Sequence, residues 1–150
     1  MKLLIIFDSN YGNTKKIAET IGRELGAQVK SVSEISDEDL KGLDLLIAGS
    51  PIHGWRPSER MVKFLAGLKD NQLEGVEAAT FDTRVKLFIH GDAAKKIAKA
   101  LKNAGAETIV EPQAIYVKGK EGPLLEGELE KAKEFTKMVI TEYESISKTN

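Results

Sequence analysis

The stretch that decides the fold is LLIIFDSNYGNT, residues 3–14. It begins with a continuous apolar run, Leu3 to Phe7, which is typical of a strand covered on both faces in a parallel sheet. The polar residues that follow, together with Gly12, indicate a tight loop. From Ile17 to Leu25 apolar residues recur at helical spacing, and Gly26 is placed to end the helix. The sequence therefore predicts a central strand, a loop and an amphipathic helix in this order.

Four more strands are expected further along the chain. Short apolar runs predict them at 28–32, at 45–48 and at 76–81, with 85–89 as the less favoured alternative for the fourth strand. The fifth strand is expected in two pieces, 108–110 and 114–117. Its interruption is attributed to Pro112, which cannot donate to a strand ladder.

Helices alternate with these strands. Ser36 opens a Ser-x-x-Asp helix start, Pro57 stands near the start of the third helix, and Asp92 is placed to cap the fourth, which Gly105 ends. The residues expected to face the core are Met61, Phe64, Leu65 and Leu68 in the third helix, Ala93, Ile97, Ala98, Leu101 and Ala104 in the fourth, and Leu129, Ala132, Phe135, Val139 and Tyr143 in the last.

Five alternations of strand and helix indicate an α/β fold with helices on both faces of the sheet. We expect a three-layer, doubly wound, five-stranded parallel sheet with strand order 2-1-3-4-5. In such sheets ligands bind beyond the carboxyl ends of the strands, where the strand order reverses. Function should therefore lie in the loops that follow strands one, three and four.

Length and charge restrict the functional classes. The chain has 150 residues, of which 41% are hydrophobic, and this suits one domain over residues 1–150. Lys plus Arg total 22 against 23 for Asp plus Glu, so no global field would recruit nucleic acid or an anionic membrane. We expect neither kind of partner, and a monomer or weak homodimer.

The chain contains no cysteine, so any redox role needs a bound cofactor. The run Leu3 to Phe7 is too short to cross a membrane, and Asp8 follows it at once, unlike a signal peptide. A cytoplasmic location is expected. His90 has no second ligand at metal-binding spacing, so no metal site is predicted.

The loop of Ser9, Asn10, Tyr11, Gly12, Asn13 and Thr14 is the first candidate site. It joins a buried strand to a helix N-terminus, where free backbone N–H groups and the helix dipole favour an anion. Gly12 lets the backbone turn tightly, and the short polar side chains offer further donors. A phosphate fits this loop, although the same residue types would serve as an ordinary turn and helix cap.

At these residues the sequence resembles the flavodoxin family, whose phosphate loop runs Ser/Thr-x-x-Gly-Asn-Thr. Ser9, Gly12, Asn13 and Thr14 match that pattern, and Tyr11 replaces a small hydroxyl residue. The likeness extends over essentially the whole chain in element order. It implies FMN as the cofactor, a flavodoxin-like fold, and electron transfer to redox partner proteins.

The loop after strand three contains Pro51, Ile52, His53, Gly54 and Trp55, which offer an apolar and aromatic surface to a flat ring. Trp55 either stacks on the ring or anchors the third helix to the core. Gly54 can turn a peptide group toward the ring. His53 is a candidate proton carrier, and Arg56 could steady negative charge on a reduced flavin, or both are solvated loop residues.

The resemblance assigns the far edge of the ring to the third loop, between Asp82 and Asp92. Candidates there are Asp82, Thr83, Arg84 and Phe88, although Phe88 would suit the core equally well. The Gly-Asp and aromatic pattern usual in the family is displaced here, with Gly91-Asp92 as a partial match.

Other folds that bind phosphate after a first strand lack support. Strand three ends without a phosphoacceptor Asp, no cysteine nucleophile exists, and no Gly-x-Gly-x-x-Gly or P-loop motif follows strand one. The favoured function is an FMN-dependent electron carrier between proteins. An NAD(P)H-dependent quinone or flavin reductase and an FMN-less interaction module remain open alternatives.

Overall fold

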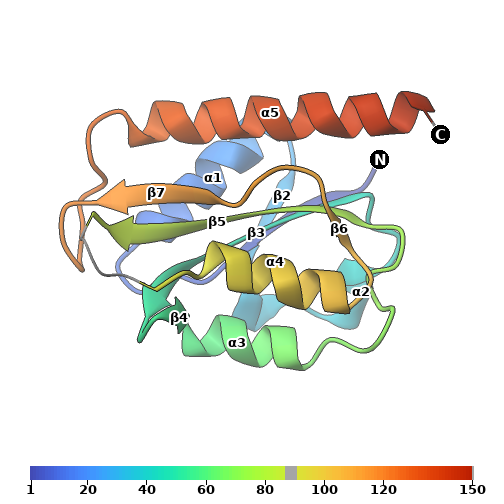
Figure 1. The fold of residues 1–150 in the computed structure, drawn as a ribbon, viewed down its shortest axis with the longest axis horizontal. Helices are drawn as coiled ribbons and strands as arrows, with labels where there is room; N and C mark the ends of the chain where they lie inside the picture. The colour runs from blue at the N-terminus through green and yellow to red at the C-terminus, as the bar shows by residue number, and fades with distance from the viewer. Residues whose placement is uncertain (87–90, 150) are drawn as a thin grey trace.

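The computed structural model describes residues 1–86 and 91–149. A twisted sheet lies between two layers of helices (Figure 1). Its strands run in the order β2-β1-β3-β5, and both β6 and β7 pair with β5. The strands are β1 (Leu3–Phe7), β2 (Gln28–Ser31), β3 (Leu45–His53), β5 (Glu77–Val85), β6 (Glu107–Thr108) and β7 (Gln113–Val117). All these pairings are parallel, which confirms the predicted doubly wound order.

The fourth strand of the sheet, β5, is longer than the sequence predicted. The favoured choice, 76–81, is confirmed, but β5 continues through Asp82 to Val85 as one strand. It can continue because β7 pairs with its second half, from Phe81 to Val85. The predicted interruption of the fifth strand is also confirmed, with the second piece at Gln113–Val117. The first piece was predicted at 108–110, but β6 covers only Glu107–Thr108, so the break begins at residue 109, before Pro112.

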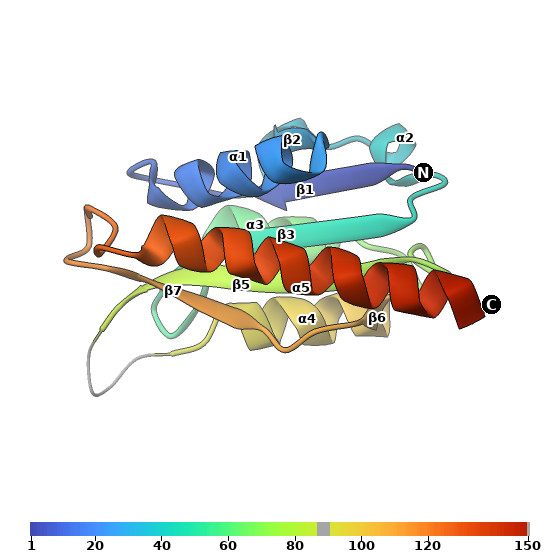
Figure 2. The ribbon, with the colours of Figure 1, turned by 90° about the horizontal axis from the view of Figure 1, so that it is seen from above.

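Alternate residues of the strands supply two separate cores. Ile5 and Ile47 point to the face covered by α1 (Asn13–Leu25) and α5 (Glu128–Thr149), where Phe135 packs among them. Ile6 and Leu46 point to the other face, covered by α3 (Glu59–Ala66) and α4 (Ala94–Asn103). Figure 2 shows α5 lying along the sheet. Burial on both faces explains why β1 reads as a continuous apolar run.

Most helix boundaries follow the expected signals. Gly26 ends α1 in the left-handed conformation, and Ser36 forms a capping box with Asp39 at the start of α2 (Asp37–Leu40). The helix α4 begins at Ala94, after the predicted cap Asp92, whose carboxylate accepts a hydrogen bond from the Lys95 backbone N–H at 2.7 Å. A single turn of 3-10 helix at 32–34 was not expected.

One short strand was not predicted. Pro57 stands near the start of α3, as predicted, but it belongs to β4 (Arg56–Pro57), which folds back antiparallel on the end of β3. Ser58 caps α3, accepting a hydrogen bond from the Met61 backbone N–H. Gly54 and Trp55 connect β3 to β4, and both have positive φ, 56° and 73°. This two-residue connection with positive φ is the type I′ pattern that suits the twist of a hairpin.

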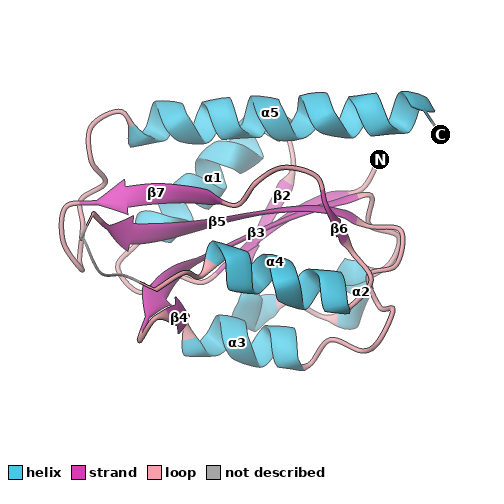
Figure 3. Cartoon of the chain, in the orientation of Figure 1, coloured by secondary structure: helices cyan, strands magenta, loops and turns pink. Residues whose placement is uncertain are grey.

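The strands end where the helices begin. In Figure 3 the arrowheads of β5 and β7 lie at the end of the sheet from which α4 and α5 start. Both chain termini lie at the opposite end (Figure 1). Within the described residues no helix is long and apolar enough to span a membrane. The carboxyl ends of the strands thus share one edge with the helix N-termini.

Candidate functional site

A cavity of about 580 Å³ opens at this edge. This volume is within the range of cofactor sites. Four chain segments line it, namely the loop after β1, the end of β3 with its hairpin, the end of β5 with Gly91, and the end of β7. The lining residues are Ser9, Asn10, Tyr11, Asn13, Thr14, Pro51, Ile52, His53, Gly54, Trp55, Thr83, Arg84, Val85, Gly91, Val117 and Lys120.

The first loop forms an open cradle at the start of α1. Gly12, with φ of 91°, stands at the N-cap position, and no side chain of the described residues caps the helix there. Its backbone N–H donates to Ser9 Oγ at 3.0 Å, which closes the turn. Thr14 is buried, and its hydroxyl lies 2.8 Å from that of Thr83 on β5. A helix N-terminus without a capping side chain, beside a cavity, suits an anionic group.

The two asparagines of this loop bind to other loops. Asn10 Nδ2 lies 3.0 Å from His53 Nε2 on β3, and Asn13 Nδ2 donates to the Glu121 carbonyl at 3.2 Å. Gly122 lies very close to Asn13. A Cβ built on Gly122 would lie 2.6 Å from the side-chain amide oxygen of Asn13. These amides therefore hold neighbouring loops around the cradle.

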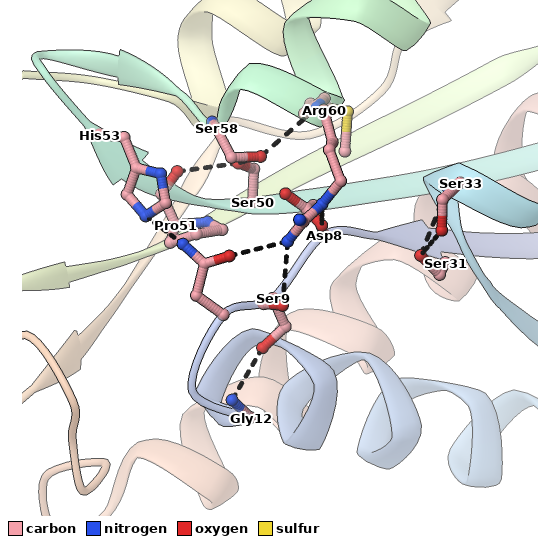
Figure 4. Close-up of polar contacts among 12 residues, drawn as sticks. Asp8, Ser9, Gly12, Ser31, Ser33, Ser50, Pro51, His53, Ser58 and Arg60 are labelled. Carbon is pink, nitrogen blue, oxygen red and sulfur yellow. Dashed lines mark hydrogen bonds and ion pairs between the residues drawn. The ribbon is translucent and has the colours of Figure 1, made fainter.

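Arg60 braces the loop from the side of α3. Its Nε donates to Asp8 Oδ1 at 2.8 Å, and its Nη2 donates to Asn10 Oδ1 at 2.7 Å. Figure 4 shows Arg60 reaching across to Asp8 and Ser9 at the end of β1. Asp8 is buried, and its Oδ2 has no hydrogen-bond partner among the described residues. The negative charge directly before the cradle is thus paired by Arg60.

Two aromatic side chains border the cavity and face solvent. Trp55 is 56% exposed and Tyr11 is 48% exposed. The interpretation of Trp55 as an anchor of the third helix to the core was wrong, because the hairpin holds the side chain outside the core. Exposed aromatic surface at the mouth of a cavity is typical of a binding site for a flat, apolar group.

Gly91 and the residues that begin α4 hold the β3–β4 hairpin in place. A Cβ at Gly91 would lie 2.1 Å from Trp55 Cα, so only glycine allows this approach. The Trp55 carbonyl accepts hydrogen bonds from the Asp92 backbone N–H at 3.3 Å and from Lys96 Nζ at 3.0 Å. Trp55 is therefore fixed through its backbone, while its ring stays exposed.

The end of β5 carries a buried ionic group. Arg84 Nε donates to Asp82 Oδ1 at 2.8 Å, and Arg84 Nη2 lies 3.2 Å from Asp92 Oδ2. Asp82 also accepts from the backbone N–H groups of Ala93 and Ala94. The hydrogen bonds to Asp82 raise the pKa of the Arg84 guanidinium above its ordinary value. Arg84 thus lines the cavity as a fixed cation beside two carboxylates.

The structure brings most of the predicted site residues together. Of the fifteen candidates proposed from the sequence, those that line the cavity are Ser9, Asn10, Tyr11, Asn13, Thr14, Pro51, Ile52, His53, Gly54, Trp55, Thr83 and Arg84. Gly12 shapes the turn beneath it, and Asp82 points to the start of α4. Phe88 and His90 lie outside the described residues.

Four lining residues were missed. Val85 and Val117 end adjacent parallel strands, so strand pairing would have placed them at this edge. Gly91 was noted only as part of a displaced Gly-Asp pattern. Lys120 follows the last strand, where the sequence offered no motif. The cradle, the aromatic walls and the cavity volume together fit a phosphate joined to a flat ring, which is the shape of FMN.

Known proteins with related sequences were found. A family model of the flavodoxin domain matches residues 4–119. An uncharacterized protein of Methanocaldococcus jannaschii is 32% identical over 113 residues, which cover 74% of this chain and 73% of that protein. Flavodoxin 1 of Salmonella typhimurium is 46% identical over 50 residues, covering 31% of this chain and 28% of that protein.

Solved structures share the fold over nearly the whole chain. Flavodoxin 1 of Bacillus cereus has a TM-score of 0.80 at 21% identity and covers 94% of this chain and 98% of its own. A flavodoxin from the domain Archaea has a TM-score of 0.78 at 23% identity, covering 98% and 99%. Flavodoxin 2 of Bacillus cereus has a TM-score of 0.77 at 26% identity, covering 92% and 97%.

Proposed function

This chain belongs to the flavodoxin family, whose cofactor is FMN, and we propose that it carries electrons between protein partners through FMN bound in the cavity after β1, β3 and β5. The observation that carries the proposal is the cradle at the start of α1, which has the family's Gly-Asn-Thr residues and no capping side chain. The phosphate of FMN would take the place of that cap.

The first loop would hold the phosphate through backbone N–H groups at the start of α1 and the hydroxyl of Ser9. Thr14 supports this loop from beneath through its contact with Thr83. Because the helix dipole also favours a negative charge here, the binding needs no lysine. The amide contacts of Asn10 and Asn13 keep the loop in shape before any ligand arrives.

The ring would lie between the hairpin and the first loop, against Trp55 and Tyr11. When bound, FMN supplies a ring that takes up one or two electrons. The protein side chains exclude water from the ring faces, while the peptide around Gly54 offers a hydrogen-bonding group at the cavity. Arg84 places a fixed positive charge in the lining, which favours negative charge on the ligand.

The proposal is tested by adding FMN to the purified apo protein. Trp55 is the only tryptophan in the chain and lines the cavity, so its fluorescence reports directly on the site. We expect saturable quenching at one FMN per chain, and a Trp55→Phe variant that binds FMN without this quenching. An apo protein that shows no saturation with FMN would refute the cofactor assignment.

A reductive titration distinguishes an electron carrier from an NAD(P)H-dependent reductase, the alternative that the sequence left open. The holoprotein is mixed with NADPH, with and without a quinone, under anaerobic conditions. A carrier leaves NADPH unoxidised and accepts electrons from dithionite. Rapid oxidation of NADPH would instead identify a reductase. The cytoplasmic location stays a prediction.

A further inference from the structure

The mouth of the cavity is bordered by basic side chains. Exposed lysines and arginines occur on every segment that forms it, in the first turn of α1, in β4, at the end of β5, in the first turn of α4 and after β7. We call the following six residues the basic rim: Lys15, Arg56, Lys86, Lys95, Lys96 and Lys120. Lys120 also lines the cavity itself.

The opposite end of the molecule carries charges of both signs. The exposed charged residues there are Asp37, Glu38, Asp70, Glu74 and Glu107, together with Lys2, Lys41, Lys69 and Lys102. The positive charge of the protein is therefore concentrated at the cavity end, where the basic rim lies. Such an asymmetry orients a protein as it approaches a charged partner.

The helix dipole does not explain why lysines occur in the basic rim. Acidic side chains are favoured in the first turn of a helix and cations in the last, because of the helix dipole. The first turns of α1 and α4 contain no acidic residue, and Lys15 and Lys95 stand there in their place. These lysines thus lie where they weaken their own helices, which suggests that their charge serves another purpose.

Most carboxylates beside the cavity are already paired. Asp8 is bound to Arg60, and Asp82 and Asp92 are bound to Arg84. The rim lysines have solvent-exposed side chains. Of these, Lys96 donates to the Trp55 carbonyl and Lys86 lies over the Tyr116 ring, and neither contact neutralises the charge. A bound phosphate would add a charge of about −2, close to the start of α1. The rim over β4, β5 and α4 would remain positive.

We propose that the basic rim docks a redox protein whose surface around its own redox centre is acidic. The inference rests on the proposed electron-transfer function and adds the kind of partner. Complementary charges speed the encounter of two proteins and orient them, and this advantage decreases as salt screens the charges. Docking at this rim would bring the partner's centre against the mouth of the cavity.

The test uses the FMN-loaded protein, reduced with dithionite, and two one-electron acceptors of opposite charge. Rubredoxin is acidic and cytochrome c is basic. Each acceptor molecule takes one electron, which reduces its ferric iron to ferrous, so two acceptors oxidise one fully reduced FMN and its protons pass to solvent. We expect the rate constant with rubredoxin to decrease as ionic strength rises, and that with cytochrome c to increase or stay constant.

Two variants of one helix localise the effect. Lys95→Glu reverses a rim charge in the first turn of α4, and Lys102→Glu reverses an exposed charge in its last turn, about 10 Å along the helix axis. At low ionic strength we expect Lys95→Glu to slow the reduction of rubredoxin about fivefold or more, and Lys102→Glu to change it little. High salt should remove the difference between them.

The outcomes distinguish the two proposals. A holoprotein that reduces a neutral quinone but treats both acceptors alike at every salt concentration refutes the basic rim and leaves electron transfer intact. Equal effects of the two variants also refute it, because docking would then not involve the cavity mouth. A protein that takes up no FMN overturns both proposals.

Discussion

Asp82 and Arg84 stand two residues apart on β5 and form a buried ion pair, with Arg84 Nε 2.8 Å from Asp82 Oδ1. This pair joins the end of the strand to the beginning of α4, because Asp82 also accepts hydrogen bonds from Ala93 and Ala94. Arg84 extends the contact to Asp92, whose backbone N–H donates to Trp55. One charged group thus positions a wall of the cavity and the hairpin beside it.

Asp82→Asn should lower the free energy of unfolding by about 3 kcal/mol, because it removes the buried carboxylate that pairs with the Arg84 charge, while the ion pair with Asp92 remains. Urea unfolding followed by circular dichroism measures this change. Glu38→Gln, which removes an exposed ion pair with Lys41, is the control and should have little effect. Equal losses in both variants would show that the buried pair does not stabilise the fold.

Gly91→Ala should weaken FMN binding. Its Cβ would lie 2.1 Å from Trp55 Cα, so the hairpin must move away from the cavity. Gly119→Ala is the matched control, because a Cβ there meets no atom within 4 Å. Titration of both apo variants with FMN measures the change. Unchanged affinity in Gly91→Ala would mean that the hairpin does not contact the ligand.

Asp39 should stabilise the fold except in strong acid. The hydrogen bond from Lys30 and that from the Ser36 backbone hold the pKa of Asp39 at about 2, below its ordinary value of 3.8. A lowered pKa in the folded state contributes stability at higher pH, and that stability is lost as the pH falls from about 4 toward 2. The melting temperature should therefore fall less between pH 4 and pH 2 in Asp39→Asn than in the unmodified protein. Asp37→Asn should behave like the unmodified protein.

Glu77, unlike Asp39, should destabilise the fold at neutral pH. Burial, and then the nearby charge of Glu107, raise the pKa of Glu77 above its ordinary value of 4.5. Its Oε2 is buried and has no partner among the described residues. The folded state then binds the proton more tightly than the unfolded state, so stability falls as the pH rises above 4.5.

Glu77→Gln should accordingly raise the melting temperature at neutral pH and have less effect at pH 4. Glu107→Gln removes only the neighbouring charge and should give a smaller increase. Differential scanning calorimetry at both pH values measures these changes. A decrease in the melting temperature for Glu77→Gln at neutral pH would contradict the assignment of a charged, poorly paired carboxylate.

Apolar periodicity was sufficient to predict the order of the main strands and helices, but not β4 or the 3-10 turn at 32–34. The run from Leu3 to Phe7 placed the central strand, and Gly26 and Ser36 marked helix ends, because these signals act within a few residues. The loop 9–14 could be identified as a site for the same reason. Its position between a buried strand and a helix N-terminus is visible in the sequence alone.

Contacts between distant loops could not be predicted in this way. The Asn10 contact with His53 and the Asn13 contact with Glu121 join residues 43 and 108 positions apart. The hairpin at Gly54 and Trp55 was missed because it requires positive φ at a tryptophan, which the side chain disfavours. Asp82 was predicted to contact the cofactor, but its carboxylate accepts hydrogen bonds from Arg84 and from the backbone N–H groups of Ala93 and Ala94.

The most direct test of the cradle compares the affinities of the apo protein for FMN and for riboflavin, which lacks the phosphate. Two or more charge-assisted hydrogen bonds at the start of α1 predict that FMN binds about 100-fold more tightly or better. Gly12→Val should remove most of this preference because φ is 91° there, whereas Gly12→Asn should keep more of it. Equal affinities for FMN and riboflavin in the unmodified protein would contradict a phosphate site in residues 9–14.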